Sequence, residues 1–186
     1  ETLNNFNKSC AVDVFFALSH GVHRGKLKIG KVDDRINFLN KLQQMTDDVK
    51  FDIYGINKIQ PIWADHYFKT IENAKMGLNL SRGKAIKYYS SDRITQIVGN
   101  GLVCLIDEKT QYRDFFNDNE MVFYKNINDL SEKILKISRD EKLRKSIARN
   151  GKEKYMKHFN SNIIAEFIIN KTLDINTKRK YFWHGK

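Results

Sequence analysis

Leu102-Val103-Cys104-Leu105-Ile106, LVCLI, is an unbroken apolar run between Gly101 and Asp107. A run this short, with a glycine before it and a charged residue after it, favours a buried strand over a helix. A strand that is apolar on both faces is typical of a parallel sheet, because helices cover both faces of such a sheet. The run therefore predicts a central strand of an α/β protein.

Strands and helices alternate on both sides of this run. Other short apolar runs indicate strands at 12–18, 50–55, 76–80 and 120–124. Apolar residues at helical spacing indicate helices at 33–45, 65–74, 92–98, 128–137, 140–159 and 161–173. Gly151 lies inside the helix over 140–159 and is expected to break or kink it. The alternation predicts a Rossmann-like parallel sheet with helices on both faces.

Length and composition fit one domain of ordinary size. The chain has 186 residues, of which 41% are hydrophobic, too many for a disordered tail. We expect a Rossmann-like domain over residues 1–175 and a basic, aromatic tail over 176–186. No apolar run approaches the roughly 18 residues of a membrane span. The polar start, Glu1–Cys10, is not expected to be a signal peptide, and a first residue other than Met suggests a piece of a longer protein.

The two cysteines, Cys10 and Cys104, bear on metal binding and on the cellular compartment. They lie far apart, with no CxxC and no paired histidine, and so predict neither a metal site nor a disulfide framework. Cys104 lies inside the apolar run and is expected to be a buried free thiol. Free thiols favour a reducing cytoplasm, with attachment to the inner face of the membrane left open.

The charge balance favours an anionic partner. The chain has 33 Lys and Arg against 22 Asp and Glu, a formal net charge of +11. Such an excess suits nucleic acid, an anionic membrane surface or a phosphorylated small molecule. The alternative is a lysine-rich surface that is merely solvated. Because neither zinc-finger spacing nor an RNP-type aromatic motif is present, nucleic acid is the least favoured partner.

Basic residues follow the first predicted strand. In a parallel α/β sheet, ligands bind at the carboxyl ends of the strands, and the loop over 19–31, SHGVHRGKLKIGK, lies at such an end. Its glycines let backbone amides approach an anion, and Arg24, Lys26 and Lys28 supply positive charge, so we predict phosphate binding. The spacing matches neither GxGxxG nor a Walker loop, and a solvated basic loop is the alternative.

A second candidate loop leads into a short helix. Ser91, or the serine before it, is placed to cap this helix, whose free amides and positive dipole end suit a diphosphate. Arg93 lies in the first turn, where a cation opposes the dipole, and so needs an anionic partner. That partner is either a phosphate or a carboxylate such as Asp92 or Asp34. Gln96 lies one turn further along and could hydrogen-bond sugar hydroxyls; alone, it would be taken as a surface residue.

Four motifs occur in order over residues 92–159. They are Arg93-Ile94-Thr95-Gln96 with Gly101 and LVCLID, FNDNEMVFY over 116–124, NDLSEKI over 128–134, and RKSIARNG over 144–151 followed by His158-Phe159. The ordered set resembles the C-terminal domain of GT-B glycosyltransferases, in particular the spore-maturation-type family, glycosyl transferases group 1. Upstream, Arg35, Tyr54-Gly55 and MGLNLS extend the resemblance loosely to residue 12.

The resemblance implies a glycosyltransferase domain, the C-terminal half of a GT-B fold, that holds a nucleoside diphosphate sugar. It implies that the base and ribose lie over Tyr54 and Gly55 and the loop that follows. It implies that the donor and its phosphates meet Arg24, Lys26, Lys28, Arg35, Arg82, Ser91, Arg93 and Gln96. No metal and no cofactor are expected, because basic groups neutralise the diphosphate, and a separate N-terminal domain is expected to bind the acceptor. Catalytic residues stay unassigned.

Two positions depart from the family pattern. Gln96 stands where the family usually has a Glu that binds ribose or sugar hydroxyls. Tyr88 stands where related retaining enzymes have the first acid of a Glu-x7-Glu motif. A neutral amide makes no charge-assisted bond to a hydroxyl. Two alternatives therefore stay open: a degenerate, non-catalytic GT-B-like domain and, with less support, a basic nucleic-acid-binding domain.

Overall fold

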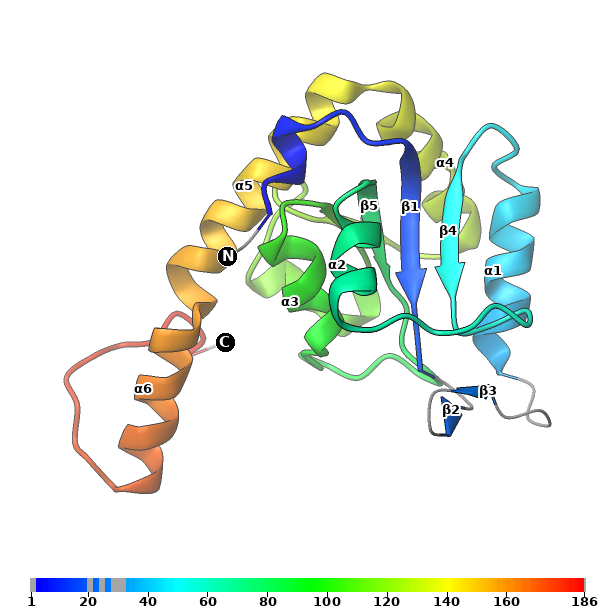
Figure 1. Ribbon diagram of the computed structural model, residues 1–186. Coiled ribbons are helices and arrows are strands. Elements are labelled where there is room, and N and C mark those ends of the chain that lie inside the picture. Colours follow the sequence, from blue (N-terminus) through cyan, green and yellow to red (C-terminus); the bar gives the residue numbers. More distant parts are fainter. Residues whose placement is uncertain (1–2, 20–21, 24–25, 28–32, 186) are drawn as a thin grey trace.

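The computed structural model describes residues 3–19, 22–23, 26–27 and 33–185, and a five-stranded parallel sheet lies at its centre (Figure 1). The strand order is β4 (Phe51–Tyr54), β1 (Val12–Ala17), β5 (Ala74–Asn79), β6 (Val103–Asp107) and β7 (Val122–Tyr124). A short antiparallel ribbon, β2 (Val22–His23) with β3 (Lys26–Leu27), follows β1. The five strands predicted from the sequence are confirmed, with small shifts at their ends.

Helices cover both faces of the sheet, as the alternating pattern predicted. They are α1 (Asp34–Gln44), α2 (Ala64–Ile71), α3 (Asp92–Gly99), α4 (Ile127–Arg139), α5 (Glu141–Phe159) and α6 (Ser161–Thr172), with 3-10 turns η1 (Asn5–Asn7), η2 (Glu108–Thr110) and η3 (Tyr112–Asp114). None of the helices in the described part of the chain is long and apolar enough to cross a membrane.

Alternate side chains of the central strands enter two separate cores. Phe16 of β1 and Leu105 of β6 belong to the core under α1 and α4. Phe15 and Cys104, their neighbours in sequence, belong to the core under α2 and α3. Burial raises the pKa of the Cys104 thiol to about 12, so it stays protonated. The LVCLI run is apolar throughout because each face of β6 is covered by helices.

Gly151 does not interrupt the helix that contains it. Helix α5 runs without a break from Glu141 to Phe159, so the predicted break is wrong. A Cβ atom at Gly151 would lie 2.2 Å from the backbone oxygen of Glu120. The residue is therefore a glycine because α5 passes very close to the chain just before β7, and its low helix propensity is the cost of that contact.

The aromatic residues near the C-terminus fold back onto α5 and α6. The Phe182 ring stacks on His158, with ring centroids 4.1 Å apart, and Trp183 stacks on Phe159 at 5.6 Å. Tyr181 is buried and accepts a hydrogen bond from Asn170 of α6. The last aromatic residues therefore pack against the domain, whereas the boundary at residue 175 stays a prediction.

The path of the chain defines one place where a ligand is expected. From β1 the chain passes first to β4, which pairs with one edge of β1. It then passes to β5, which pairs with the opposite edge of β1. The loops that follow β1 and β5 therefore separate at the carboxyl edge of the sheet. Such a topological switch point leaves a crevice in which open α/β sheets bind ligands.

Candidate functional site

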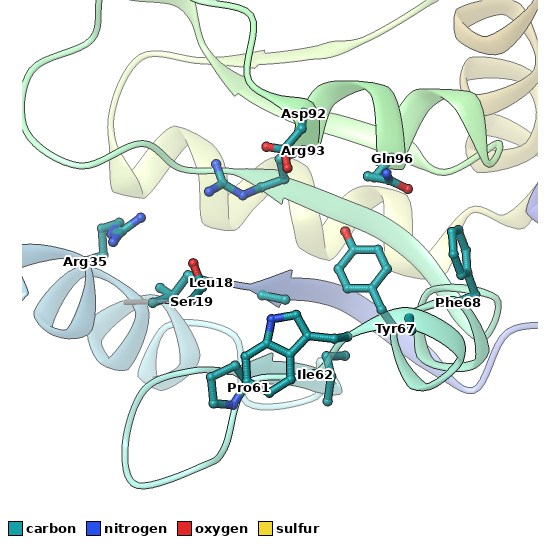
Figure 2. A pocket seen from close by; sticks show the side chains of 13 residues that line it. Leu18, Ser19, Arg35, Pro61, Ile62, Tyr67, Phe68, Asp92, Arg93 and Gln96 are labelled. Carbon is teal, nitrogen blue, oxygen red and sulfur yellow. The ribbon is translucent and has the colours of Figure 1, made fainter. Parts of the chain in front are cut away.

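A cavity of about 570 Å³ lies at this switch point (Figure 2). Four segments line it: the end of β1, the start of α1, the start of α3, and the loop before α2 together with its first turns. The lining residues are Ala17, Leu18, Ser19, Arg35, Pro61, Ile62, Trp63, Ala64, Tyr67, Phe68, Asp92, Arg93 and Gln96. Three of the predicted site residues, Arg35, Arg93 and Gln96, are therefore brought together.

Arg35 carries its own counter-ion. Asp33 caps α1 by accepting from the backbone N–H of Arg35 at 3.0 Å, and its two oxygens accept from Nε at 2.9 Å and Nη2 at 2.7 Å. Both side chains are almost fully buried. The hydrogen bond from the Arg35 side chain holds the pKa of Asp33 well below its usual range. The charge of Arg35 is thus largely neutralised within the protein.

Arg93 reaches the cavity without such a partner. Its Nη1 donates to Asn79 Oδ1 and to the backbone oxygen of Leu80, both at 3.3 Å, and its guanidinium lies 5.4 Å from the Phe16 ring centroid. No carboxylate among the described residues lies within ion-pair distance of Arg93, so the predicted direct pair with Asp92 or Asp34 is not formed. Burial lowers the pKa of Arg93 and the positive charge of Arg35 lowers it further, although the charge of Asp92 still acts to raise it.

The start of α3 is open to an anion. Ser91 occupies the N-cap position, but its hydroxyl donates to Asn79 Oδ1 at 3.0 Å and makes no capping hydrogen bond. The predicted position is confirmed, while the predicted capping by the serine side chain is wrong. A helix start without a side-chain cap leaves backbone N–H groups available to a ligand.

Sequence reasoning missed Asn79, which organises this side of the cavity. It is the last residue of β5, is 4% exposed, and accepts from both Ser91 and Arg93. The signal was present in MGLNL, where one amide interrupts an apolar strand at the edge where ligands bind.

An aromatic wall formed by Trp63, Tyr67 and Phe68 lines the cavity opposite its basic residues. The loop after Gly55, which contains Trp63, was predicted to hold the base and ribose, but these three aromatic residues were not singled out. Trp63 and Phe68 are each 47% exposed although they are large and apolar. Figure 2 shows the Tyr67 ring and the amide of Gln96 on the same side of the cavity. Burial raises the pKa of Tyr67 to about 12, so its hydroxyl stays protonated. The available signal was four aromatic residues, counting His66, within WADHYF over 63–68, which begins two residues after the single proline, Pro61.

Other predicted residues lie outside this cavity. The Tyr54 ring packs against His66 at 6.2 Å, and Gly55 has a positive φ of 85° with no room for a Cβ beside the Leu18 backbone oxygen. Arg82 is exposed in the loop between β5 and α3. Tyr88, in the same loop, donates to the Asp114 carboxylate. The assignment of base and ribose to Tyr54 and Gly55 stays a prediction.

The basic loop after β1 is described only in part. Arg24 and Lys28 lie outside the described residues, and Lys26 is placed only as part of β3. Phosphate binding by these three residues therefore stays a prediction. Within the ranges that the structure describes, no group of three or more His, Cys, Asp or Glu side chains could hold a metal ion.

A family model matches most of the chain. The model described as glycosyl transferase-like matches residues 35–170. No curated protein sequence matches the chain.

Solved structures share the fold at low sequence identity. A mutant of S. aureus TarM, in complex with fondaparinux, alpha-GlcNAc-glycerol and UDP, matches with a TM-score of 0.62 and 17% identity, over 88% of this chain and 36% of its own. Anabaena Alr3699/HepE, in complex with UDP and glucose, matches with a TM-score of 0.64 and 9% identity, over 90% and 49%.

A third structure matches along most of its own length. It is the C-terminal domain of LpcC, a glycosyl transferase group 1 family protein from Francisella tularensis, with a TM-score of 0.52 and 12% identity over 83% of this chain and 89% of that domain. The present chain thus spans about a third of TarM and half of HepE. It belongs to the glycosyl transferase-like family and has the fold of the C-terminal half of a GT-B glycosyltransferase.

Proposed function

We propose that this chain is the part of a glycosyltransferase that binds a nucleoside diphosphate sugar, in the cavity at the switch point. One observation carries the proposal: Arg93 lines that cavity without a carboxylate partner among the described residues, at the uncapped start of α3. A cation and free backbone N–H groups at one place suit the two phosphates of a nucleoside diphosphate.

The chemistry explains why positive charge is needed there. Glycosyl transfer breaks the bond between the sugar carbon and the diphosphate oxygen, so negative charge builds up on the departing diphosphate. Arg93, the N–H groups of α3 and the basic residues Arg24, Lys26 and Lys28 would stabilise that charge, which accelerates the reaction if they are already in place. With basic groups in that role, the reaction needs no metal ion.

The remaining cavity residues suit the nucleoside. Exposed aromatic faces such as Trp63 and Phe68 offer surfaces on which a base can stack, and the Gln96 amide can donate to and accept from ribose hydroxyls. The loop over 55–63 leads from Tyr54 and Gly55 directly to the aromatic wall. The residues predicted to hold the base are therefore close in sequence to residues that line the cavity.

A second protein part would supply the acceptor. The chain spans only 36% of TarM and 49% of HepE. The remaining length of those chains supports the proposal that an acceptor-binding domain closes over the carboxyl edge of the sheet. The described chain alone should then bind the sugar nucleotide but transfer the sugar slowly.

Calorimetric titration with UDP, GDP, ADP, CDP and dTDP tests the proposal. We expect micromolar binding of one of them, about 8 kcal/mol of binding free energy. In thermal unfolding, that nucleotide at 100 times its dissociation constant should add about 2.7 kcal/mol of stability. No heat from any of the five up to millimolar concentration would refute the proposal, and stabilisation by DNA or RNA alone would favour a nucleic-acid-binding domain.

A degenerate binding domain is the second candidate, and one contact favours it. The Tyr88 hydroxyl is engaged by Asp114, and its ring packs 4.9 Å from Phe115, so this side chain does not replace the family's acid at the ligand. Slow hydrolysis of the bound sugar nucleotide distinguishes the two candidates. Release of free sugar above the rate without protein supports a catalytic domain, whereas binding without any release supports a degenerate one.

A further inference from the structure

Two short helices carry two facing sides of the large cavity. Helix α2 supplies Tyr67 and Phe68 of the aromatic wall, and α3 supplies Arg93 and Gln96. Each helix has eight residues and is about 12 Å long. Helices of that length are not stable on their own. The distance between the two sides of the cavity therefore depends on what holds the far ends of α2 and α3.

A single buried residue, Asn5 of η1, joins these far ends. Its side chain is fully buried, and Nδ2 donates to the backbone oxygens of Ile71 at 2.7 Å and Ala74 at 3.1 Å. Ile71 is the last residue of α2, and Ala74 is the first residue of β5. The backbone N–H of Asn5 donates to the oxygen of Asn100 at 3.2 Å, directly after α3. Asn5 therefore binds the end of α2, the start of β5 and the end of α3.

Further contacts fasten the end of α3 to the segment around η1, residues 3–8. The Asn100 side chain donates to the backbone oxygen of Gln96 at 2.8 Å and accepts from the backbone N–H of Leu3 at 3.1 Å. The Phe6 ring packs on Gly101, where a Cβ atom would lie 2.8 Å from it. Because the last carbonyls of a helix have no partner within the helix, the bond to Gln96 completes this end of α3.

Arg144 of α5 holds the η1 segment in place. Its guanidinium is fully buried and donates to the backbone oxygens of Asn5 at 3.3 Å and Lys8 at 3.1 Å. Both Glu141 oxygens bind it, at 2.7 and 2.6 Å. Figure 1 shows the segment beside α5 at the edge of the sheet where β1 begins. Arg144, the first residue of the RKSIARNG motif, thus fixes the backbone at the residue that joins the two helices.

The amide of Asn5 is not explained by stability alone. Its Oδ1 atom is buried and has no hydrogen-bond partner among the described residues. An unpaired buried acceptor destabilises a fold. An apolar side chain would avoid this penalty but could not bind the carbonyls at the ends of two separate elements. The contacts of Nδ2 therefore point to a role in holding these elements at a set distance.

We infer that Asn5 and Asn100 are positioning residues, which fix the separation between the aromatic wall on α2 and the phosphate site on α3. The inference rests on the proposed function, because only a ligand that touches both sides depends on this separation. A nucleoside diphosphate does so, with its base on the aromatic wall and its phosphates at Arg93. Inorganic diphosphate binds at α3 alone. Both asparagines act from the opposite edge of the sheet and touch no ligand.

Calorimetry with two ligands tests the inference. Wild type, Asn5→Ala and Asn100→Ala are titrated with inorganic diphosphate and with whichever of UDP, GDP, ADP, CDP and dTDP binds wild type tightest. If the loosened helices are in the binding arrangement about a tenth of the time, Asn5→Ala should weaken the nucleotide about tenfold and diphosphate by less than about twofold. Asn100→Ala should act in the same direction with a smaller loss, because its backbone oxygen still accepts from Asn5.

A matched control separates positioning from a loss of stability. Ser131→Ala removes a buried hydroxyl that donates to the Asn128 backbone oxygen at 2.8 Å within α4, which contributes none of the residues given above as lining the cavity. It should lower the unfolding temperature without changing either affinity. Hydrogen exchange gives a readout without ligand: Asn5→Ala should speed exchange in the last turns of α2 and α3, whereas exchange in α4 should stay as in wild type.

The outcomes distinguish this inference from the proposed function. If the nucleotide binds and both asparagine variants change the two affinities by the same factor, or change neither, the positioning role is wrong and the nucleotide site stands. If Asn5→Ala does not fold, Asn100→Ala decides by the same comparison. If diphosphate binds too weakly to measure, nucleotide affinities equal to that of Ser131→Ala would overturn the inference. If none of the five nucleotides binds wild type, both proposals fail together.

Discussion

Helices α1 and α3 both begin at the carboxyl edge of the sheet, on either side of the same cavity, and both place an arginine in it. At α1 the carboxylate of Asp33 caps the helix and binds Arg35 through both its oxygens. At α3 the hydroxyl of Ser91 is directed to Asn79, and Arg93 has only neutral acceptors among the described residues. The cation at the start of α1 is neutralised within the protein, whereas the proposed function assigns an anionic ligand to the cation at the start of α3.

The contrast shows that a basic residue beside a cavity is weak support for ligand binding until its partners are known. Arg35 and Arg93 look equally suitable in the sequence. Removing the ion pair at α1 should cost folding stability, whereas removing the cation at α3 should cost ligand affinity. The predictions that follow test this division.

The largest effect is expected on folding, at Asp33. Asp33→Ala removes the cap of α1 and leaves the buried guanidinium of Arg35 without its counter-ion, which should lower the free energy of unfolding by about 3–5 kcal/mol. Asp140→Ala is the control, because Asp140 caps α5 by accepting from the Leu143 N–H at an exposed position. It should cost about 1 kcal/mol. Equal losses in urea unfolding would show that the ion pair contributes nothing beyond capping.

The same ion pair predicts a dependence of stability on pH. The pKa of Asp33 is lowered by folding, so the native state favours its ionised form. Its contribution should be complete above the unfolded pKa of about 3.9 and decrease as the pH falls below that value. The difference in unfolding free energy between wild type and Asp33→Asn should thus be constant from about pH 5 to 8 and shrink below about pH 3.9. A difference that shrinks near neutral pH would contradict this assignment.

A smaller effect, on binding rather than folding, is expected at Arg93. Charge-assisted hydrogen bonds to ionised groups contribute about 1.5–3 kcal/mol, so Arg93→Ala should weaken nucleotide binding at least tenfold. Arg139→Ala is the matched control, since Arg139 ends α4 and pairs with Asp48 at an exposed site outside the cavity. Similar losses from both variants, measured by calorimetry at low and high salt, would indicate non-specific attraction to a basic protein.

A still smaller effect is expected at Ser91. Its hydroxyl donates to Asn79 and does not cap α3, so Ser91→Ala should cost about the 0.5–1.5 kcal/mol of one hydrogen bond in thermal unfolding. Nucleotide affinity should fall far less than for Arg93→Ala, because the backbone N–H groups of α3 remain. A loss of affinity as large as that of Arg93→Ala would make the serine hydroxyl itself a phosphate ligand.

The sequence was sufficient for the elements of the fold because their signals are local. The LVCLI run is apolar on both faces, and both faces of β6 are buried. The requirement for an anionic partner at Arg93 followed from its position in a helix, where a cation opposes the dipole. These predictions depend on residues a few positions apart.

The errors and omissions depend on contacts between distant segments. Gly151 was expected to break a helix, but its role is set by the backbone of Glu120, which lies more than one full element away in the sequence. Asn79 acquires its importance only when α3 brings Ser91 and Arg93 to the end of β5. The ion pair that neutralises Arg35 depends on rotamers of neighbouring side chains, which periodicity does not encode.

The smallest and most specific prediction concerns Gln96, which lines the cavity one turn after Arg93 where the family usually has a glutamate. Gln96→Glu nearly preserves side-chain size and adds one negative charge. If this side chain faces ribose or sugar hydroxyls, the carboxylate should bind them through stronger, charge-assisted hydrogen bonds. The gain is limited, because the same charge repels the diphosphate bound nearby.

The decisive quantity for Gln96 is therefore a difference between ligands. Affinity for UDP-glucose should change more favourably than affinity for inorganic diphosphate, which carries the same repulsion and no hydroxyls of ribose or sugar. UDP should respond like UDP-glucose if the ribose is the contact, and like inorganic diphosphate if the sugar is. Equal changes for all three ligands would place Gln96 outside the site. The start of α3 would then bind phosphate alone. The glutamine in place of the family's glutamate would no longer be an argument for a degenerate domain.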